Sequence, residues 1–224
     1  MDDDGIRQLK DAGCIRIAIG VESTSEATRR DVLNRKDTNE QILNAARILH
    51  KYDILFSVCH ILGLPGEGNA EYRHALDFYN QLRPSIVNPF WLVYFPGTKI
   101  VDIALERGLI DREDLPLIDR GLANNSQNLG IGRGKQLGPV PFKNYAFLLG
   151  ILPVMPKRAM QFLIDRGIFF DGWNAPVFVI SLVRLLALVK DGTIKYYPGI
   201  IAGILRNFLK IGLRSARYNL ARGK

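Results

Sequence analysis

The sequence predicts an α/β fold: three parallel strands with their helices, followed by an all-helical C-terminal extension. Between residues 1 and 110, apolar runs of strand length alternate with segments in which apolar residues recur at helical spacing. From residue 142 onward, only the helical spacing continues. Strands and helices that alternate at this spacing indicate parallel strands joined by right-handed crossovers. Residues 111–141 are polar and rich in glycine, so we expect a connecting loop there.

Three segments have the composition of strands, near residues 14–21, 54–62 and 87–94. In the first segment, every second side chain is aliphatic, and the positions between carry small or polar residues. Pro89 indicates that the third strand begins irregularly or lies at a sheet edge, because proline cannot donate a hydrogen bond to a neighbouring strand.

Helices are expected before, between and after these strands. The first is short and ends at Gly13, with acidic residues near its positively polarised N-terminus. A capping box of Thr38 and Gln41 opens the helix before the second strand. The other predicted helices have the sequences TSEATRRDVLN, NAEYRHALDFYNQL, KIVDIALERGL, FKNYAFLLGIL, PKRAMQFLIDRG, APVFVISLVRLLALVKDG and GIIAGILRNFLKIGLRSARYNL.

Each predicted strand ends in a segment that contains glycine: GVES, GLPGE and YFPGT. Parallel sheets bind ligands at the carboxyl ends of their strands. Glycine permits positive φ angles and a close approach of the backbone, while Glu22 and Glu67 bring carboxylates to the same rim. Ala18 and Gly20 leave room beneath Glu22 on its face of the strand. Each segment alone is typical of an ordinary turn, but three at one rim favour a ligand site.

These segments, in their order and spacing, resemble the second half of the core of the radical S-adenosylmethionine (radical SAM) superfamily. The resemblance runs from about residue 6 to residue 110 and includes LKDAGCIRIAIGVES, LNRKDTNEQ, HILGLPGE and PFWLVYFPGT. Within the superfamily, the chain is similar to the cobalamin-associated branch that contains anaerobic magnesium-protoporphyrin IX monomethyl ester cyclase. The resemblance implies the C-terminal half of a partial (β/α)6 TIM-like barrel. It also implies a methylase or cyclase type of enzyme acting on a lipid-like or tetrapyrrole-like substrate.

The resemblance assigns S-adenosylmethionine-binding positions to the three strand ends. It places GVES near the nucleoside and ribose, GLPGE against the adenine, and YFPGT where it helps to close the cavity. Cobalamin is a further cofactor that the branch implies. The positions carried over by motif match are Gly20, Glu22 and Ser23, then Gly63, Pro65, Gly66 and Glu67, and finally Pro96, Gly97 and Thr98.

The 4Fe-4S cluster of this superfamily is held by a CxxxCxxC loop, which the chain lacks. Its two cysteines, Cys14 and Cys59, lie far apart in predicted strands and are interpreted as buried thiols in a reducing cytoplasm. We therefore expect no metal ligands in this chain, and no radical chemistry from it alone, because the cluster supplies the electron. The resemblance implies the C-terminal portion of such an enzyme, and three origins are open: a gene truncation, a split gene or a misplaced start codon. In the split-gene case, an N-terminal half encoded upstream is the partner of this chain.

His60 is the one catalytic candidate. It lies two residues before Leu62 in the second strand, and if it faced the cavity it would serve as a proton donor. The alternative is a packed, hydrogen-bonded histidine, which is the commoner role of a single histidine in a strand.

The positive charge of the chain is concentrated at its C-terminal end. Residues 184–224 contain nine Lys or Arg and one acid, which gives +8, whereas residues 1–183 sum to zero because the whole chain is also +8. An amphipathic helix is expected over residues 198–220, with basic side chains on one face. Those side chains are Arg206, Lys210, Arg214 and Arg217.

Two roles are open for this basic helix: it binds an anionic membrane surface, or it docks on its own protein. The first role defines an alternative function, that of a non-catalytic module that binds a membrane surface or a partner. No motif indicates nucleic-acid binding, and no apolar run reaches the roughly 20 residues of a membrane span. We therefore expect a cytoplasmic protein, which associates peripherally with membranes in the case that the basic helix binds their surface.

Overall fold

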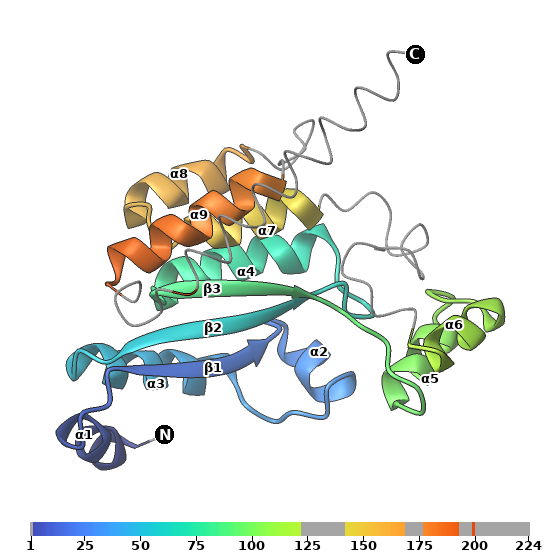
Figure 1. The fold of residues 1–224 in the computed structure, drawn as a ribbon, viewed down its shortest axis with the longest axis horizontal. Coiled ribbons are helices and arrows are strands. Elements are labelled where there is room, and N and C mark those ends of the chain that lie inside the picture. The colour runs from blue at the N-terminus through green and yellow to red at the C-terminus, as the bar shows by residue number, and fades with distance from the viewer. Residues whose placement is uncertain (1, 122–141, 169–176, 193–198, 200–224) are drawn as a thin grey trace.

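Three parallel strands form the centre of the molecule (Figure 1). Strands β1 (Arg16–Glu22), β2 (Leu55–Leu62) and β3 (Ile86–Trp91) pair in the order β1-β2-β3. Both pairs are parallel, as the alternation of strands and helices predicted. The β3 strand ends three residues earlier than expected.

The computed structural model describes residues 2–121, 142–168 and 177–192, together with residue 199. The predicted basic helix over residues 198–220 lies outside this described part, apart from the single residue 199. Most of the predicted glycine-rich connection also lies outside it. The described start of that connection is not a plain loop, because it forms η1 (Arg112–Asp114) and α6 (Leu115–Asp119).

The register of the sheet follows from the alternation of aliphatic residues in β1. Ile17 pairs with Phe56 and Ile19 with Val58, so apolar side chains of neighbouring strands share one face. Pro89 lies in β3, which is an edge strand of this sheet, in agreement with the tolerance of sheet edges for proline.

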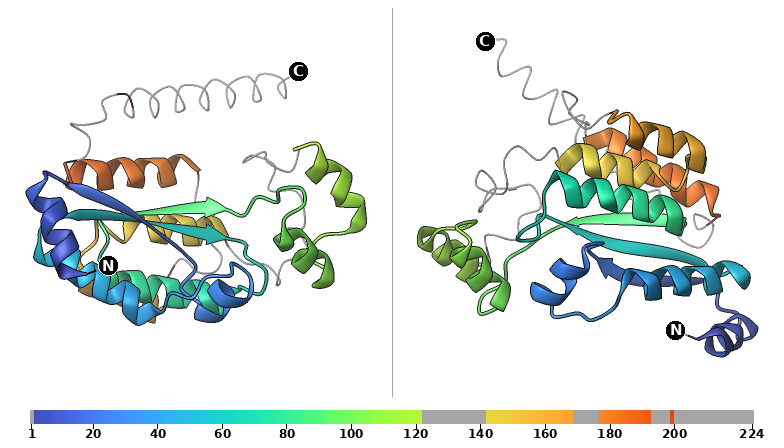
Figure 2. Two further views of the ribbon diagram at one scale, coloured as in Figure 1. Left: turned by 90° about the horizontal axis from the view of Figure 1, so that it is seen from below. Right: turned by 180° about the vertical axis from the view of Figure 1, so that it is seen from behind.

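Helices cover both faces of the sheet (Figure 2). The face that carries Phe56 packs against α3 (Asn39–Lys51) and α4 (Asn69–Leu82), and α3 begins with the predicted capping box. The opposite face lies beneath α9 (Val177–Lys190). A parallel sheet needs cover on both faces, and here the second cover comes from the C-terminal helical region.

Two further helices of the C-terminal region complete this arrangement. Helix α7 (Phe142–Ile151) packs along β3 and against α9, while α8 (Lys157–Asp165) packs against α4. Side chains from α7, α8 and α9 belong to the same buried core as those of β1, β2 and β3. The C-terminal helices therefore share the core of the sheet and do not form a core of their own.

An ion pair ties the end of α9 to the start of β1. Arg16 donates through Nη2 to Asp191 Oδ2, and through Nη1 to Ser85 Oγ at 3.2 Å. Asp191 lies 175 residues after Arg16 and its side chain is 6% exposed. This contact fixes α9 over the face of the sheet opposite α3.

The remaining helices lie at the two ends of the sheet. Helix α1 (Asp3–Asp11) precedes β1 and α2 (Glu26–Asp31) follows it, whereas α5 (Lys99–Glu106) follows β3. Helices α5 and α6 share a second, smaller apolar cluster. Within the part of the chain that the structure describes, no helix is long and apolar enough to cross a bilayer.

Candidate functional site

The backbone at the end of β1 is irregular at Glu22. The pairing with β2 shifts register between Gly20 and Glu22, which makes a β-bulge there. Glu22 has a φ of 64°, and the Ser23 N–H donates to Val21 O at 2.8 Å, as in a γ-turn. A positive φ at a residue other than glycine costs free energy, and such strain concentrates at functional sites. The bulge redirects the Glu22 side chain.

The Glu22 carboxylate folds back over Gly20. A Cβ atom at Gly20 would lie 2.5 Å from Glu22 Oε1, so only glycine leaves room for this carboxylate. Arg35 Nη1 would lie 3.6 Å from the same Cβ atom. Partial burial raises the pKa of Glu22, and the positive charge of Arg35 opposes that rise. The predicted space beneath Glu22 is therefore present and is occupied by its own side chain.

A buried hydrogen bond joins the ends of β1 and β2. The Ser23 hydroxyl donates to Glu67 Oε1. Ser23 is fully buried and Glu67 is 2% exposed. Burial raises the pKa of Glu67 to about 7, although the hydrogen bond from Ser23 acts in the opposite direction. Ser23 and Glu67, which were predicted as separate site positions, are thus in direct contact. Their contact lies in the interior of the protein and does not line a cavity.

Glu67 also has an unsatisfied atom. Its second carboxylate oxygen, Oε2, is buried and accepts no hydrogen bond from the residues that the structure describes. A buried acceptor that receives no hydrogen bond lowers the stability of the folded protein by roughly 1–3 kcal/mol. Protonation of the carboxyl group reduces this cost, in agreement with the raised pKa.

The GLPGE loop is held from two sides. The Gly63 N–H donates to the Tyr72 hydroxyl at 2.8 Å, and Arg107 donates through Nη1 to Pro65 O at 3.0 Å. Gly66 has a φ of 92°, and a Cβ atom there would lie 2.7 Å from Arg107 Nη1. Glycine at this position therefore permits the positive φ angle and also leaves room for the side chain of Arg107, the residue that follows α5.

The third predicted segment, YFPGT, forms an exposed turn before α5. Pro96 and Gly97 are exposed, and Gly97 has a φ of 68°. The Thr98 hydroxyl donates to Phe95 O at 2.6 Å, within the turn itself. The structure thus brings the first two strand ends into contact through Ser23 and Glu67, while the third forms its own turn.

His60 lies on the face of β2 that packs against α3 and α4, opposite the face that carries Gly20 and Cys59. Its Nδ1 is 3.0 Å from the Tyr79 hydroxyl of α4, and the residue is buried. Desolvation lowers the pKa of His60 to about 3, which keeps the ring neutral. This environment agrees with the packed alternative and gives no support to a cavity-facing proton donor.

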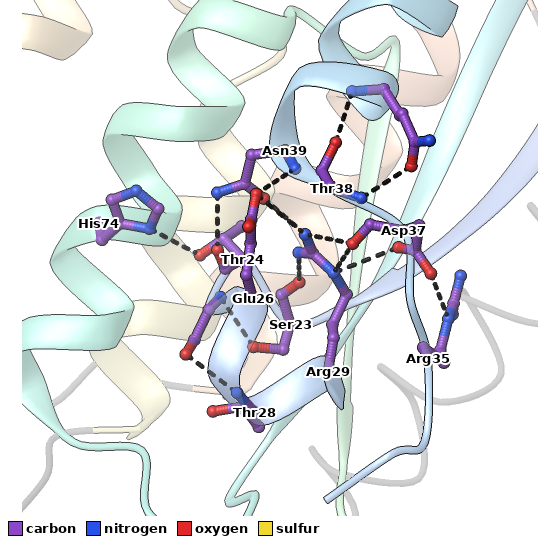
Figure 3. A network of polar contacts seen from close by, with 12 residues as sticks. Ser23, Thr24, Glu26, Thr28, Arg29, Arg35, Asp37, Thr38, Asn39 and His74 are labelled. Carbon is purple, nitrogen blue, oxygen red and sulfur yellow. Dashed lines mark hydrogen bonds and ion pairs between the residues drawn. The ribbon is translucent and has the colours of Figure 1, made fainter. Parts of the chain in front are cut away.

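A network around Arg29 holds the loops that follow β1 (Figure 3). Arg29 is fully buried and donates to Ser23 O, to Asp37 O at 3.0 Å and to Asn39 Oδ1 at 2.8 Å. Desolvation lowers the pKa of Arg29, and the charge of Asp37 opposes this effect. Sequence reasoning missed Arg29, because an arginine in the polar segment TSEATRRDVLN has the pattern of a solvated side chain.

The two cysteines are half-buried and not paired with each other. Burial and the nearby Glu22 raise the pKa of Cys59, so its thiol is neutral near pH 7. Within the described ranges, no group of three or more His, Cys, Asp or Glu side chains could hold a metal ion. The whole sequence contains only two cysteines, so the donor set of a 4Fe-4S cluster does not fit this chain alone.

Residues 1–79 match the family model of the Radical SAM superfamily. The matched segment includes β1, α3, β2 and most of α4, with both strand ends that Ser23 and Glu67 connect. No curated protein matches the chain.

The α/β architecture and the three-stranded parallel sheet are consistent with part of a TIM-like radical SAM fold. The superfamily in general uses S-adenosylmethionine and a 4Fe-4S cluster. Because this chain alone lacks the donor set of the cluster, S-adenosylmethionine is the cofactor to consider for it.

Proposed function

We propose that this chain provides the S-adenosylmethionine-side and substrate-side half of a radical SAM enzyme. The observation that supports the proposal most directly is the hydrogen bond between Ser23 and Glu67, because it joins two family motifs at the carboxyl ends of adjacent parallel strands. The residues of this chain do not include the cluster ligands, since two cysteines cannot supply three thiolates.

The residues of the rim divide into two roles. Glu22 is partly exposed beside Arg35, so it is available to accept hydrogen bonds from the ribose or amino groups of S-adenosylmethionine. Ser23, Glu67 and Arg107 hold the loops in place. When it is reductively cleaved, S-adenosylmethionine supplies a deoxyadenosyl radical. This chain contributes binding and orientation to that chemistry.

The reaction class and substrate follow from the motif resemblance. We propose a methylase or cyclase type of reaction on a lipid-like or tetrapyrrole-like compound, with cobalamin as a further cofactor of the complete enzyme. The support is the similarity of LGLPGE and PFWLVYFPGT to the cobalamin-associated branch.

Binding of S-adenosylhomocysteine tests the proposal without the cluster. We expect the purified chain to bind this analogue in isothermal titration calorimetry, and we expect Glu22→Gln to weaken the affinity about tenfold because a charge-assisted hydrogen bond is lost. Glu40→Gln, an exposed position on α3, is the matched control and should leave the affinity unchanged. An affinity that is equal in both variants would remove Glu22 from the site, and no binding by the wild-type chain would contradict the proposed half-site.

A further inference from the structure

Glu67 connects the loops that follow β1 and β2. Its side chain comes from the GLPGE loop after β2 and accepts a hydrogen bond from the Ser23 hydroxyl, which belongs to the loop after β1. Both side chains lie in the interior of the protein. This contact, which we call the rim latch, therefore holds one strand-end loop in position relative to the other.

The groups around Glu67 favour its neutral form. Burial raises the pKa of Glu67, and the neighbouring Glu71 of α4 acts in the same direction, whereas the hydroxyls of Ser23 and Thr28 act in the opposite direction. Within the described part of the chain, Glu67 Oε2 accepts no hydrogen bond. An ionised Glu67 would therefore be a buried charge with little to stabilise it.

The aromatic groups beside Glu67 carry no charge near pH 7. Burial raises the pKa of Tyr72 and of Tyr79, and the nearby Glu67 raises it further. Glu22, at the end of β1, is a second carboxylate that acts on Tyr79. His60 of β2 lies 3.0 Å from the Tyr79 hydroxyl and is neutral, because burial lowers its pKa to about 3. None of these groups supplies a positive charge.

Two cations contact the same loops through backbone carbonyl groups. Arg29 of α2 donates to Ser23 O, and Arg107 donates to Pro65 O at 3.0 Å. The group that donates to the Glu67 carboxylate itself is the neutral hydroxyl of Ser23. A buried carboxylate without a cationic partner is strongly unfavourable, so ionisation of Glu67 favours its transfer to water.

Glycines on both sides of Glu67 give its side chain a route to solvent. Gly66 is exposed and has a φ of 92°, and Gly68 is the N-cap residue of α4. Because glycine adopts a wide range of backbone angles, rotation at these two positions can turn Glu67 outward while α4 stays folded.

We propose that the rim latch is controlled by a proton. The neutral carboxyl group of Glu67 closes the latch on Ser23. The ionised group turns to solvent between Gly66 and Gly68, and the GLPGE loop then loses its link to the loop after β1. One consequence, a half-site for S-adenosylmethionine whose shape changes with pH, rests on the proposed function.

The latch should open as the pH rises. The pKa of Glu67 is about 7 in the closed form, and the ordinary value of 4.5 applies once the group is in water. The contribution of the neutral carboxyl group is complete below pH 4.5 and is lost as the pH rises through 7. Between pH 5 and pH 7, the equilibrium constant for opening should therefore rise more than about tenfold.

Hydrogen exchange of residues 63–68, followed by mass spectrometry, measures this opening without a ligand. The N–H groups of Gly63, Glu67 and Gly68 are hydrogen-bonded when the loop is closed. After correction for the intrinsic rate, their exchange should accelerate more than about tenfold from pH 5 to pH 7 in the wild type. It should stay constant in Glu67→Gln, whose neutral amide oxygen still accepts from Ser23. Glu40→Gln, at an exposed position on α3, is the matched control and should keep the wild-type response.

The wild-type chain also provides a test that does not require a variant to fold. Exchange of α3 in the same samples reports on global unfolding. Acceleration in residues 63–68 that exceeds the acceleration in α3 would support the latch. Equal acceleration in both segments, or none in the loop, would overturn it, as would the same response in Glu67→Gln and the wild type.

Ser23→Ala tests the hydrogen bond that closes the latch. At pH 5, the loop of this variant should exchange several times faster than the loop of the wild type, because the neutral carboxyl group has lost its donor. An unchanged rate would show that the contact does not hold the loop. Since these experiments contain no S-adenosylmethionine or analogue, failure of the latch and failure of the proposed half-site are separate results.

Discussion

At the scale of single residues, Glu67 and His60 are two buried ionisable groups that make the stability of the protein depend on pH in opposite directions. Each is held in its neutral form by desolvation. Glu67 releases its proton less readily than an ordinary carboxyl group, whereas His60 binds a proton less readily than an ordinary imidazole. The pH dependence of unfolding therefore distinguishes the two groups.

We predict that Glu67→Gln removes a decline in stability with rising pH. The pKa of Glu67 is about 7 in the folded protein and 4.5 ordinarily, so the unfolded chain loses its proton first as the pH rises. Stability contributed by the neutral carboxyl group is complete below pH 4.5 and falls by roughly 3 kcal/mol by about pH 7. Urea unfolding should show that the variant gains stability relative to the wild type across this range. A constant difference between the two proteins would show that Glu67 is already ionised when folded.

We predict the opposite slope for His60→Gln. The pKa of His60 is about 3 when folded and 6.5 ordinarily, so its contribution is complete above pH 6.5 and is lost as the pH falls. Below pH 6.5, the wild type should lose about 1.4 kcal/mol per pH unit relative to the variant. The same urea experiments measure this loss. His74→Gln, at an exposed position in α4, provides the control for replacing a histidine.

At the scale of elements, the ion pair between Arg16 and Asp191 links α9 to β1. We predict that Arg16→Gln destabilises the protein by about 3 kcal/mol, because Asp191 is left buried without its cation. The double variant Arg16→Gln/Asp191→Asn should lose less than the sum of the two single changes. Urea unfolding gives the energies, and hydrogen exchange should show faster opening of α9.

An exposed ion pair of the same kind provides the control. Arg7 and Asp4 lie on α1 with side chains 54% and 63% exposed, so Arg7→Gln should cost less than about 1 kcal/mol. Equal losses from Arg16→Gln and Arg7→Gln would show that the Arg16 contact does not hold α9.

Local patterns in the sequence were sufficient to locate the elements of the sheet layer. Alternating isoleucines specify β1, and the Thr38–Gln41 capping box marks the start of α3, because both signals depend on near neighbours. Boundaries were less accurate, since the end of β3 depends on where pairing with β2 stops.

Contacts between distant segments could not be predicted in the same way. Glycine and glutamate at the strand ends predicted a ligand site at that edge of the sheet. The hydrogen bond from Ser23 to Glu67, however, depends on how two loops 44 residues apart in the sequence are positioned relative to each other. The burial of Arg29 depends on three acceptors, in two loop residues and in the first residue of α3. Likewise, nothing in the apolar sequence of α9 specified which face of the sheet it covers.

At the scale of the whole molecule, the number of cysteines limits the chemistry of the isolated chain. We predict that anaerobic reconstitution with iron and sulfide yields no stable 4Fe-4S cluster and no reductive cleavage of S-adenosylmethionine, because two cysteines are too few. Iron analysis, electron paramagnetic resonance and chromatography of 5′-deoxyadenosine measure these outcomes. Stoichiometric iron together with cleavage would contradict the expectation that this chain alone cannot hold the cluster.

The contact between Arg16 and Asp191 also determines the order in which the molecule is completed during synthesis. The pairs β1-β2 and β2-β3 join segments that are close in the chain, so they form early, whereas the cover that α9 provides requires a residue 175 positions later. The end of β3 at Trp91 and Asp191 are about 100 residues apart, so at about 5–20 residues per second translation leaves that face of the nascent sheet open for roughly 5–20 seconds. During this interval, we expect chaperones to bind the apolar surface that α9 later covers. The yield of folded protein should therefore depend on how quickly the ribosome reaches the end of α9.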